Sequence, residues 1–266
     1  MKNRIVLTLI LFIIVNGTIK AQILFTESFS VILDTTKTVK GNIVPDFKYQ
    51  TQKKNLLEFE NNADLTFRVK SNAVTFANKI ELSKYGGETL LSGGYLYGEY
   101  RKIYEKKVTL EMFAQVHWAE ARGMELKYAG GVNARWRILT RDNVGIFAGA
   151  GPFYEFERWN YEGVADTSLI PANTTPVENS NVKLGTYISF KYAGIKNIFL
   201  DLSLYHQSRF DEIFDTPRLA SSSGITYSFT EHLGLSLIYQ NIYDFSPVVP
   251  IDKLFHRVIF SLSISF

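Results

Sequence analysis

The sequence predicts an all-β protein: a transmembrane, antiparallel, up-and-down β-barrel of about 12 strands, with 10 or 14 as the neighbouring even numbers, preceded by a signal peptide. Three observations predict it. Apolar and polar side chains alternate over long segments, the period of two that is typical of a strand. These segments reach the roughly 9–11 residues of a tilted membrane strand, whereas soluble strands average about 5–6. The chain starts with a secretory signal, and its last apolar-polar strand ends on Phe266.

Residues 1–21 have the layout of a secretory signal peptide. Lys2 and Arg4 precede an unbroken apolar run over residues 5–15, and a short polar stretch then ends at Ala21. The run is shorter than the roughly 20 apolar residues of a membrane-spanning helix. We therefore expect cleavage after Ala21. The chain has no cysteine, which excludes a lipoprotein anchor, disulfides and thiolate metal sites.

Removing the signal peptide removes the net charge. Three of the 29 basic residues, Lys2, Arg4 and Lys20, lie in the signal, so the mature chain has 26 basic and 26 acidic residues. A balanced chain has no net field to attract nucleic acid, and we expect no nucleic-acid partner. The 266 residues minus these 21 leave 245, a length that fits one barrel.

The strands are predicted from residue 41 onward. In the segment from Leu57 to Val69, most odd positions are apolar and the even positions are polar. The same criterion predicts strands at 41–51, 56–70, 73–84, 89–103, 107–120, 124–139, 143–158, 181–193, 197–210, 216–229, 232–244 and 254–266. Residues 41–266 are therefore expected to form the barrel. Residues 22–40 are expected to be a periplasmic segment or an extra strand, with a strand candidate at 23–34.

The lengths of the connections set the orientation. With Phe266 on the periplasmic side, the long segments 159–180, 210–216 and 244–253 fall on the extracellular side. The short turns at 70–73, 103–107, 139–143, 193–197 and 229–232 fall on the periplasmic side, the asymmetry that bacterial membrane barrels show. By analogy with such barrels, we expect the barrel assembly machinery to recognise the last strand, with Phe266 as the signal.

Aromatic residues gather near the predicted strand ends. Amphipathic rings prefer the boundary between hydrocarbon and headgroups, so this pattern favours two aromatic girdles in contact with outer-membrane lipid. The residues concerned are Trp118, Trp136, Trp159, Tyr192, Phe210, Tyr243, Phe245 and Phe255.

Opposite the apolar positions, the alternation places a mixed set of charged and polar side chains in the lumen. The predicted lumen-lining residues are Glu58, Glu60, Asp64, Arg68, Glu111, His117, Lys127, Arg135, Arg137, Glu155 and Glu157. A barrel of about 12 strands has an interior between the side-chain-filled eight-stranded barrels and the open 16-stranded porins. The mixed charges could interlock as a polar plug or line a narrow channel, and the sequence leaves both open.

One pair of residues allows a catalytic hypothesis. His206 and Ser208 are two apart near the extracellular end of strand 197–210, on the outward face with Leu204. Such a pair could hydrolyse lipid as outer-membrane phospholipases do. No carboxylate or amide that would orient His206 is evident, so we expect no enzymatic activity and interpret the pair as interfacial polar residues. The other histidines lack metal-ligand spacing, and no metal or other cofactor is expected.

Several stretches resemble a known family. They are Leu91 to Arg101, with two glycines before Tyr95, then Phe113 to Trp118, Tyr128 to Arg137 and Gly149 to Trp159. They are similar to a domain-of-unknown-function family of outer-membrane proteins described as salt-induced. The resemblance covers roughly residues 41–266. It implies an outer-membrane barrel of a Gram-negative bacterium with no established activity, and it supplies no catalytic or binding residue.

These observations together predict a monomeric outer-membrane β-barrel with either a structural role or a role in passing small solutes through a polar, partly plugged lumen. Two alternatives stay open. One is a lipid-modifying, phospholipase-like enzyme that uses His206 and Ser208. The other is binding of a partner at the cell surface through loop 159–180, which only the length of that loop supports.

Overall fold

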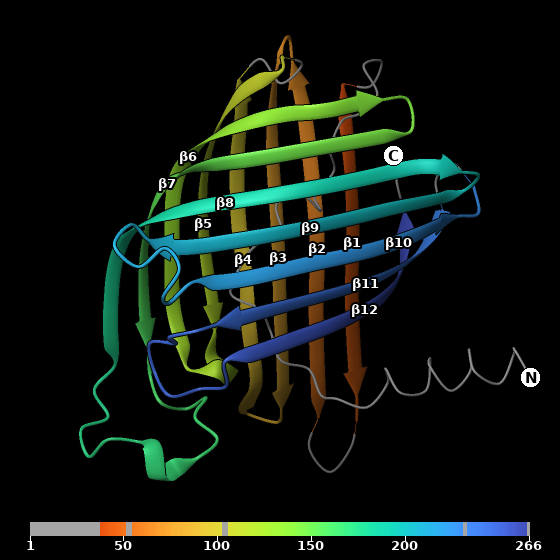
Figure 1. Ribbon diagram of the computed structural model, residues 1–266. Helices are drawn as coiled ribbons and strands as arrows, with labels where there is room; N and C mark the ends of the chain where they lie inside the picture. The colour runs from red at the N-terminus through yellow and green to blue at the C-terminus, as the bar shows by residue number, and fades with distance from the viewer. Residues whose placement is uncertain (1–37, 52–54, 103–105, 231–232, 265–266) are drawn as a thin grey trace, which may run out of the picture.

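A computed structural model of the chain describes residues 38–51, 55–102, 106–230 and 233–264, and these form one twelve-stranded antiparallel sheet. Each strand pairs with the next along the chain, from β1 to β12 (Figure 1). The strands are β1 (Val39–Gln50), β2 (Leu56–Val69), β3 (Asn72–Tyr85), β4 (Glu88–Lys102), β5 (Val108–Ala119), β6 (Met124–Arg141), β7 (Val144–Trp159), β8 (Val177–Ile195), β9 (Ile198–Arg209), β10 (Arg218–Ser228), β11 (Leu233–Asp244) and β12 (Leu254–Ile264).

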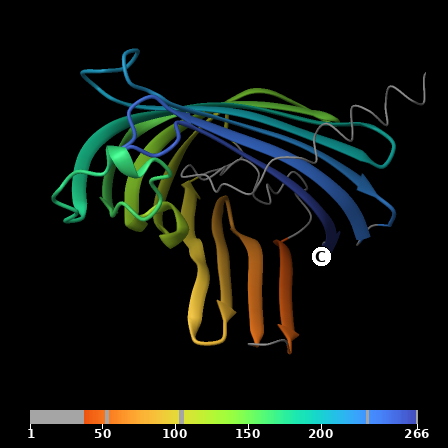
Figure 2. The same cartoon turned by 90° about the horizontal axis from the view of Figure 1, so that it is seen from below.

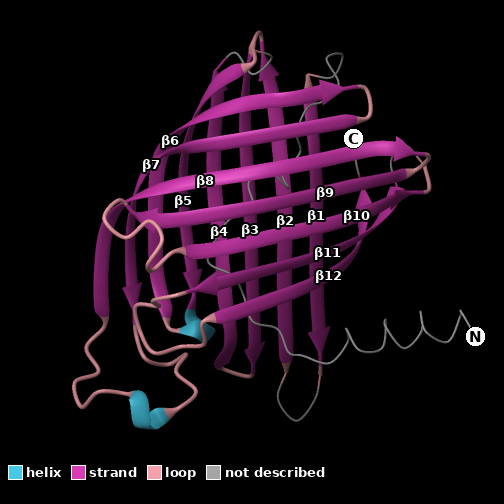
Figure 3. Cartoon of the chain, viewed as in Figure 1, coloured by secondary structure: helices cyan, strands magenta, loops and turns pink. Residues whose placement is uncertain are grey.

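The all-β fold class and the strand number of 12 are confirmed, and each predicted segment overlaps one observed strand. The only helical elements among the described residues are two 3-10 turns, η2 (Glu120–Arg122) and η3 (Thr167–Leu169), as Figure 3 shows in cyan. No described helix has the length and hydropathy needed to cross a membrane. The predicted signal peptide at 1–21, the candidate strand at 23–34 and Phe266 lie outside the described residues.

The sheet curls strongly on itself. In Figure 1, β8 to β12 cross in front of β1 to β4 at a steep angle, and Figure 2 shows the curled layer from below. No ladder joins β1 to β12 among the pairings of the described residues. Arg257 of β12 nevertheless reaches Glu81 of β3, with Nη2 3.4 Å from Oε1, so side chains bridge the interior between the two ends of the sheet.

The two faces of the sheet have opposite polarity. The outer face exposes large apolar side chains, among them Leu204 (59% exposed) and Phe260 (70%). The inner face buries charged ones, among them Lys127 and Glu157, each 1% exposed. A soluble protein shows the reverse, because charged side chains are almost never fully buried without partners. An apolar outer surface around a polar interior is the pattern of a barrel in lipid.

The alternation explains this arrangement strand by strand. Directly opposed residues of antiparallel neighbours project to the same face. Lys127 of β6 pairs with Glu157 of β7, and Tyr97 of β4 pairs with Gln115 of β5. The period of two therefore keeps one continuous inner face through most of the sheet.

The connections at the two ends differ as predicted. At one end, two-residue turns contain Lys70 and Asn197 with positive φ (56° and 64°), a conformation that asparagine tolerates better than lysine. At the other end lie the longer connections, among them those that contain η2 and η3, together with the two-residue turn between β3 and β4. Strand β8 starts at Val177, four residues before the prediction, because its first residues pair with β7 as far as Trp159. The loop predicted at 159–180 therefore spans only 160–176.

At this loop end, apolar side chains from three connections pack into a cluster that we call the loop cap. Its buried members are Ala119, Met124, Trp159, Val164, Val249, Ile251 and Phe255. Arg122 of η2 lies over the ring of Phe255, with Cζ 3.7 Å from the centroid, and burial lowers the pKa of this guanidinium. Trp159 and Phe255 therefore do not belong to the predicted aromatic girdles, because they face inward. Trp136, Phe210, Tyr243 and Phe245 are exposed.

Candidate functional site: a layered lumen

The side chains of the inner face form three layers from the loop end to the turn end. The loop-side tier consists of Lys127, Glu155, Glu157, Lys183, Arg218 and Asp244. The aromatic tier consists of Tyr97, Phe113, Phe153, Tyr187 and Tyr205. The turn-side tier consists of Glu99, Arg101, Glu111 and Arg135. Two charged layers thus enclose an uncharged one.

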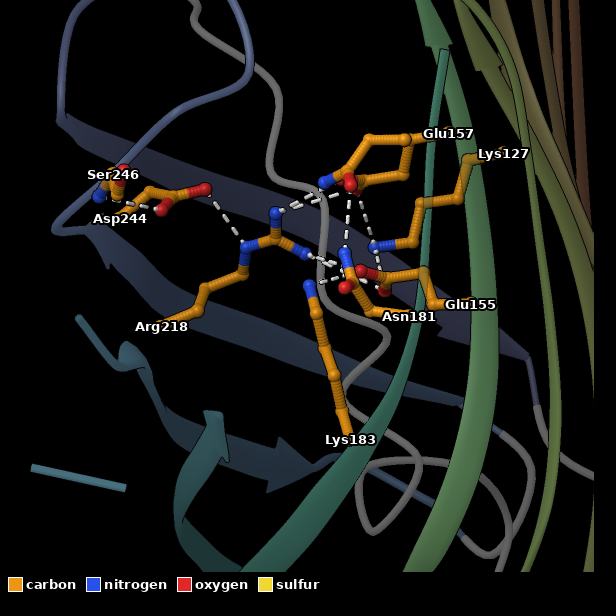
Figure 4. A network of polar contacts seen from close by, with 9 residues as sticks. Lys127, Glu155, Glu157, Asn181, Lys183, Arg218, Asp244 and Ser246 are labelled. Atoms are coloured by element: carbon orange, nitrogen blue, oxygen red, sulfur yellow. Dashed lines mark hydrogen bonds and ion pairs between the residues drawn. The ribbon is translucent and has the colours of Figure 1, made fainter. Parts of the chain in front are cut away.

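Arg218 of β10 is the centre of the loop-side tier (Figure 4). Its Nε donates to Asp244 Oδ2 at 2.9 Å, its Nη1 lies 3.4 Å from Glu155 Oε1, and its Nη2 lies 3.3 Å from Glu157 Oε1. Glu155 and Glu157 belong to β7, three strands away from β10. The guanidinium therefore crosses the interior instead of pairing along one ladder, and this contact narrows the lumen.

Two lysines complete the loop-side tier. Lys127 Nζ lies 2.6 Å from Glu155 Oε2 and 3.2 Å from Glu157 Oε1, and Lys183 Nζ lies 2.5 Å from Glu155 Oε1. The tier thus has three cations and three carboxylates. Buried charges are tolerated when they are paired and hydrogen-bonded, and removing one member leaves another uncompensated. The balanced tier has no net charge with which to select an ion by sign.

The turn-side tier repeats this principle. Arg101 pairs with Glu99 beside it and with Glu111 of β5, where Nε and Oε1 are 2.9 Å apart. The guanidinium of Arg135 lies 4.1 Å from the centroid of the Phe147 ring and 3.6 Å from Glu111. Tyr187 of β8 donates to Glu111 Oε2 at 2.8 Å, again from a strand three places away.

The aromatic tier lies between these charges. Tyr97 stacks on Phe113 with centroids 6.4 Å apart, Phe113 lies 6.3 Å from Phe153, and Tyr187 lies 6.0 Å from Tyr205. The rings partly enclose a cavity of about 50 Å³, which the amides of Gln115, Asn133 and Gln207 also line. Gly149 leaves room for the ring of Tyr187 and Gly185 for the ring of Phe153, whereas Gly151 lies against Val132 and Asn133 of β6.

The structure places all eleven predicted lumen residues on the inner face, in different surroundings. Glu111, Lys127, Arg135, Glu155 and Glu157 belong to the two charged tiers. His117 is buried, and its ring centroid lies 5.5 Å from that of Tyr95. Arg137 pairs with Phe147 at the turn end. That these residues line a solute path stays a prediction.

The four predicted residues of β2 lie apart from the tiers. Glu60 contacts Lys79 of β3 at 3.3 Å and Arg257 of β12 at 3.8 Å, and Glu58 contacts Lys48 of β1 at 2.8 Å. Asp64 and Arg68 lie further toward the turn end, half-buried on the same strand. These four side chains are on the inner face, as predicted, but they contribute to a separate group of charges.

Sequence reasoning did not single out the aromatic tier or Arg218 and Asp244. The inner position of the rings could have been predicted. Tyr97 and Glu99 are both at odd positions of one strand, and so are Phe153 and Glu155, so each pair projects to the same face. Aromatic residues were assigned to lipid contact instead. For Arg218 the alternation predicts that the side chain is on the inner face, but it does not predict the partners. Contacts across the interior depend on the curvature of the sheet.

The ladder gives His206 and Ser208 the outward phase of β9, opposite Thr186 and Leu184 of β8, but Ser208 is buried and His206 is among the residues that line the cavity of the aromatic tier. His206 Nε2 lies 2.9 Å from the carbonyl oxygen of Ile213, so this ring nitrogen already has a partner. Ser208 is 2% exposed, and its Oγ has no hydrogen-bond partner in the described part of the chain. No hydrogen bond joins the two side chains there. Residues 38–51, 55–102, 106–230 and 233–264 contain no group of His, Asp or Glu that could hold a metal.

Fold and inner face together define an all-β protein of the up-and-down class: twelve antiparallel strands in chain order, with an apolar outside and a charged inside. The chain belongs to the family described as "Protein of unknown function, DUF481", whose model matches residues 47–266. The predicted family is therefore confirmed. No curated protein matches the chain. A solved structure, the NanC porin in a rhombohedral crystal form, is similar with a TM-score of 0.47 and 10% identity, over 86% of this chain and 98% of that one.

Proposed function

We propose that this protein resides in the outer membrane of a Gram-negative bacterium and passes small hydrophilic solutes through a lumen that its own side chains narrow. The reversed polarity of the sheet is the observation that carries the proposal. A polar interior inside an apolar outer face is what a path for hydrophilic solutes through lipid requires, and an interior closed by interlocked charges is the rival.

The charged tiers and the small cavity indicate that this path through the lumen is narrow. The contacts from Arg218 to β7 and from Tyr187 to β5 cross the interior, and the cavity between them has about 50 Å³. Large solutes would have to break several charge-assisted contacts at once. Small ones need only local side-chain movement. The function supported best is therefore restricted passage, and the rival is a closed, structural barrel.

Swelling of proteoliposomes tests the proposal. The refolded protein is placed in liposomes, which are diluted into isosmotic glycerol, urea, sorbitol or raffinose, and light scattering follows the entry of solute. We expect swelling with at least one of the small solutes and none with raffinose. Protein-free liposomes are the control. Absence of swelling with every solute would leave the structural role as the better explanation.

A further inference from the structure

The lining of the cavity in the aromatic tier contains no Asp, Glu, Lys or Arg, although such side chains lie on both sides of it. The lining consists of the five rings of the aromatic tier, the amide side chains of Gln115, Asn133 and Gln207, and the residues Gly185, Thr186 and His206. The hydroxyls of Tyr97 and Tyr187 donate to Glu99 at 2.6 Å and to Glu111 at 2.8 Å. These bonds hold both rings in place, with their apolar faces available to the cavity.

One polar atom in this lining needs a partner. Gln207 Oε1 is buried and accepts no hydrogen bond from the described residues. Buried polar atoms are nearly always satisfied, and an unsatisfied one is costly unless water or a ligand supplies the bond. Because Gln207 belongs to the lining of the cavity, a molecule inside the cavity could supply the missing donor.

The size of the cavity limits that molecule. Its volume of about 50 Å³ exceeds the roughly 10–15 Å³ that a cavity needs to hold one water molecule, so it has room for a small polar molecule. A short polyol can replace water there, because its hydroxyls donate and accept while its C–H groups contact aromatic faces. A sugar ring is too large for the cavity unless the rings move.

The charge of that molecule is limited as well. An ion would lose its hydration at a lining that has no carboxylate, ammonium or guanidinium group, and burying a charge without such a partner costs free energy. The charged groups of the neighbouring tiers are already paired with one another. An uncharged solute has a smaller desolvation free energy, and the amides offer it hydrogen bonds that replace those to water.

We propose that the aromatic tier is a binding site for small uncharged polyhydroxy solutes of about glycerol size, and that it selects them over ions and larger sugars. The proposal rests on the passage of solutes proposed above and adds the class of solute and the residues that choose it. Gln207 supplies an acceptor, Phe153 and Tyr205 supply apolar faces, and Gly185 preserves the space.

Two substitutions and one matched control test the site. A Cβ added at Gly185 would lie 3.4 Å from Phe153 Cε1, so Gly185→Leu fills the cavity from its wall. Gly98 lies on the outer face, where the nearest atom to an added Cβ is Phe76 Cε1 at 3.8 Å, and Gly98→Leu is the control. Gln207→Leu keeps the size of the side chain and removes the acceptor. Heat-modifiable migration on gels confirms that each variant is folded.

The readout is the swelling rate in glycerol, in sorbitol and in potassium lactate, with valinomycin present so that potassium can follow lactate. Glycerol should enter fastest. Gly185→Leu should reduce its rate to that of protein-free liposomes, Gly98→Leu should leave it unchanged, and Gln207→Leu should lower it about fivefold, the effect of losing one neutral hydrogen bond. If Gly185→Leu does not fold, the Gln207→Leu result decides.

The outcomes separate the two proposals. Entry of none of the solutes would contradict the proposed function itself. Entry of lactate or sorbitol as fast as glycerol, or undiminished glycerol entry in folded Gly185→Leu, would overturn only the selectivity of the aromatic tier. A large potassium conductance in planar bilayers would do the same, because it would mean that the rings attract cations.

Discussion

At the scale of single residues, the interior depends on charges that have no access to bulk water. Arg218 joins β7, β10 and β11 through Glu155, Glu157 and Asp244 and is 5% exposed. Such a group can be neutral in its net contribution to stability and still be costly to remove, because its partners stay buried. The loop-side tier should therefore tolerate concerted change better than single change.

We expect Arg218→Ala to destabilise the folded barrel by about 3–5 kcal/mol, because three carboxylates would then share two lysines. Arg158→Ala is the control, since Arg158 pairs with Glu125 at 2.8 Å while its side chain is 46% exposed, and such pairs contribute about 0–1 kcal/mol. Urea titration followed by gel migration measures both. Equal losses in the two variants would contradict the central role of Arg218.

Ser208 provides a second prediction at this scale. His206 Nε2 faces the carbonyl oxygen of Ile213 instead of Ser208, so the proton-accepting contact that a serine nucleophile requires is not made. Neither the unaltered protein nor Ser208→Ala should release fatty acid from phospholipid vesicles above background. Release by the unaltered protein that disappears in Ser208→Ala would revive the lipid-hydrolysing alternative.

At the scale of elements, the loop cap connects the β5–β6, β7–β8 and β11–β12 loops. Ile251 and Trp159 are both buried in it, so Ile251→Asp would place a carboxylate in an apolar cluster. We expect the cap to loosen and the fluorescence of Trp159 to shift to longer wavelength. The measurement uses a chain in which Trp118 and Trp136 are replaced by phenylalanine.

Phe214→Asp is the control for the cap, because Phe214 is 90% exposed in the β9–β10 loop and does not belong to the cluster. Its emission should match that of the parent chain. A fluorescence spectrum of Ile251→Asp identical to that of the parent would show that the loops do not depend on this packing.

The elements also show how far the sequence could be interpreted. Strand β7 was predictable at 143–158, because alternation over so many residues occurs in no helix. The inner position of Glu155 and Glu157 followed from the same period. Their contact with Arg218 did not, since the period assigns a face to each residue but says nothing of which strands the curvature brings opposite one another. The position of Trp159 in the loop cap could not be predicted from the sequence for the same reason.

At the scale of the whole molecule, the assignment to a membrane rests on what surrounds the outer face. In water, replacing an exposed leucine by a charged residue would affect stability equally little in a strand and in a loop. In lipid they differ, because a basic side chain near the middle of a barrel strand costs about 2–4 kcal/mol and one outside the bilayer costs little. The chain contains a matched pair for this comparison.

Leu204, at the middle of β9, is 59% exposed, and Leu169, in η3 of the β7–β8 loop, is 55% exposed. We expect Leu204→Arg to lower the unfolding free energy in lipid vesicles by about 2–4 kcal/mol and Leu169→Arg to leave it nearly unchanged. Folding of each variant into vesicles at increasing urea measures the difference. Because the two side chains are almost equally exposed, simple exposure cannot produce a large gap between them. A gap therefore reports the lipid around β9, and equal stabilities would mean that the apolar face meets something other than a bilayer.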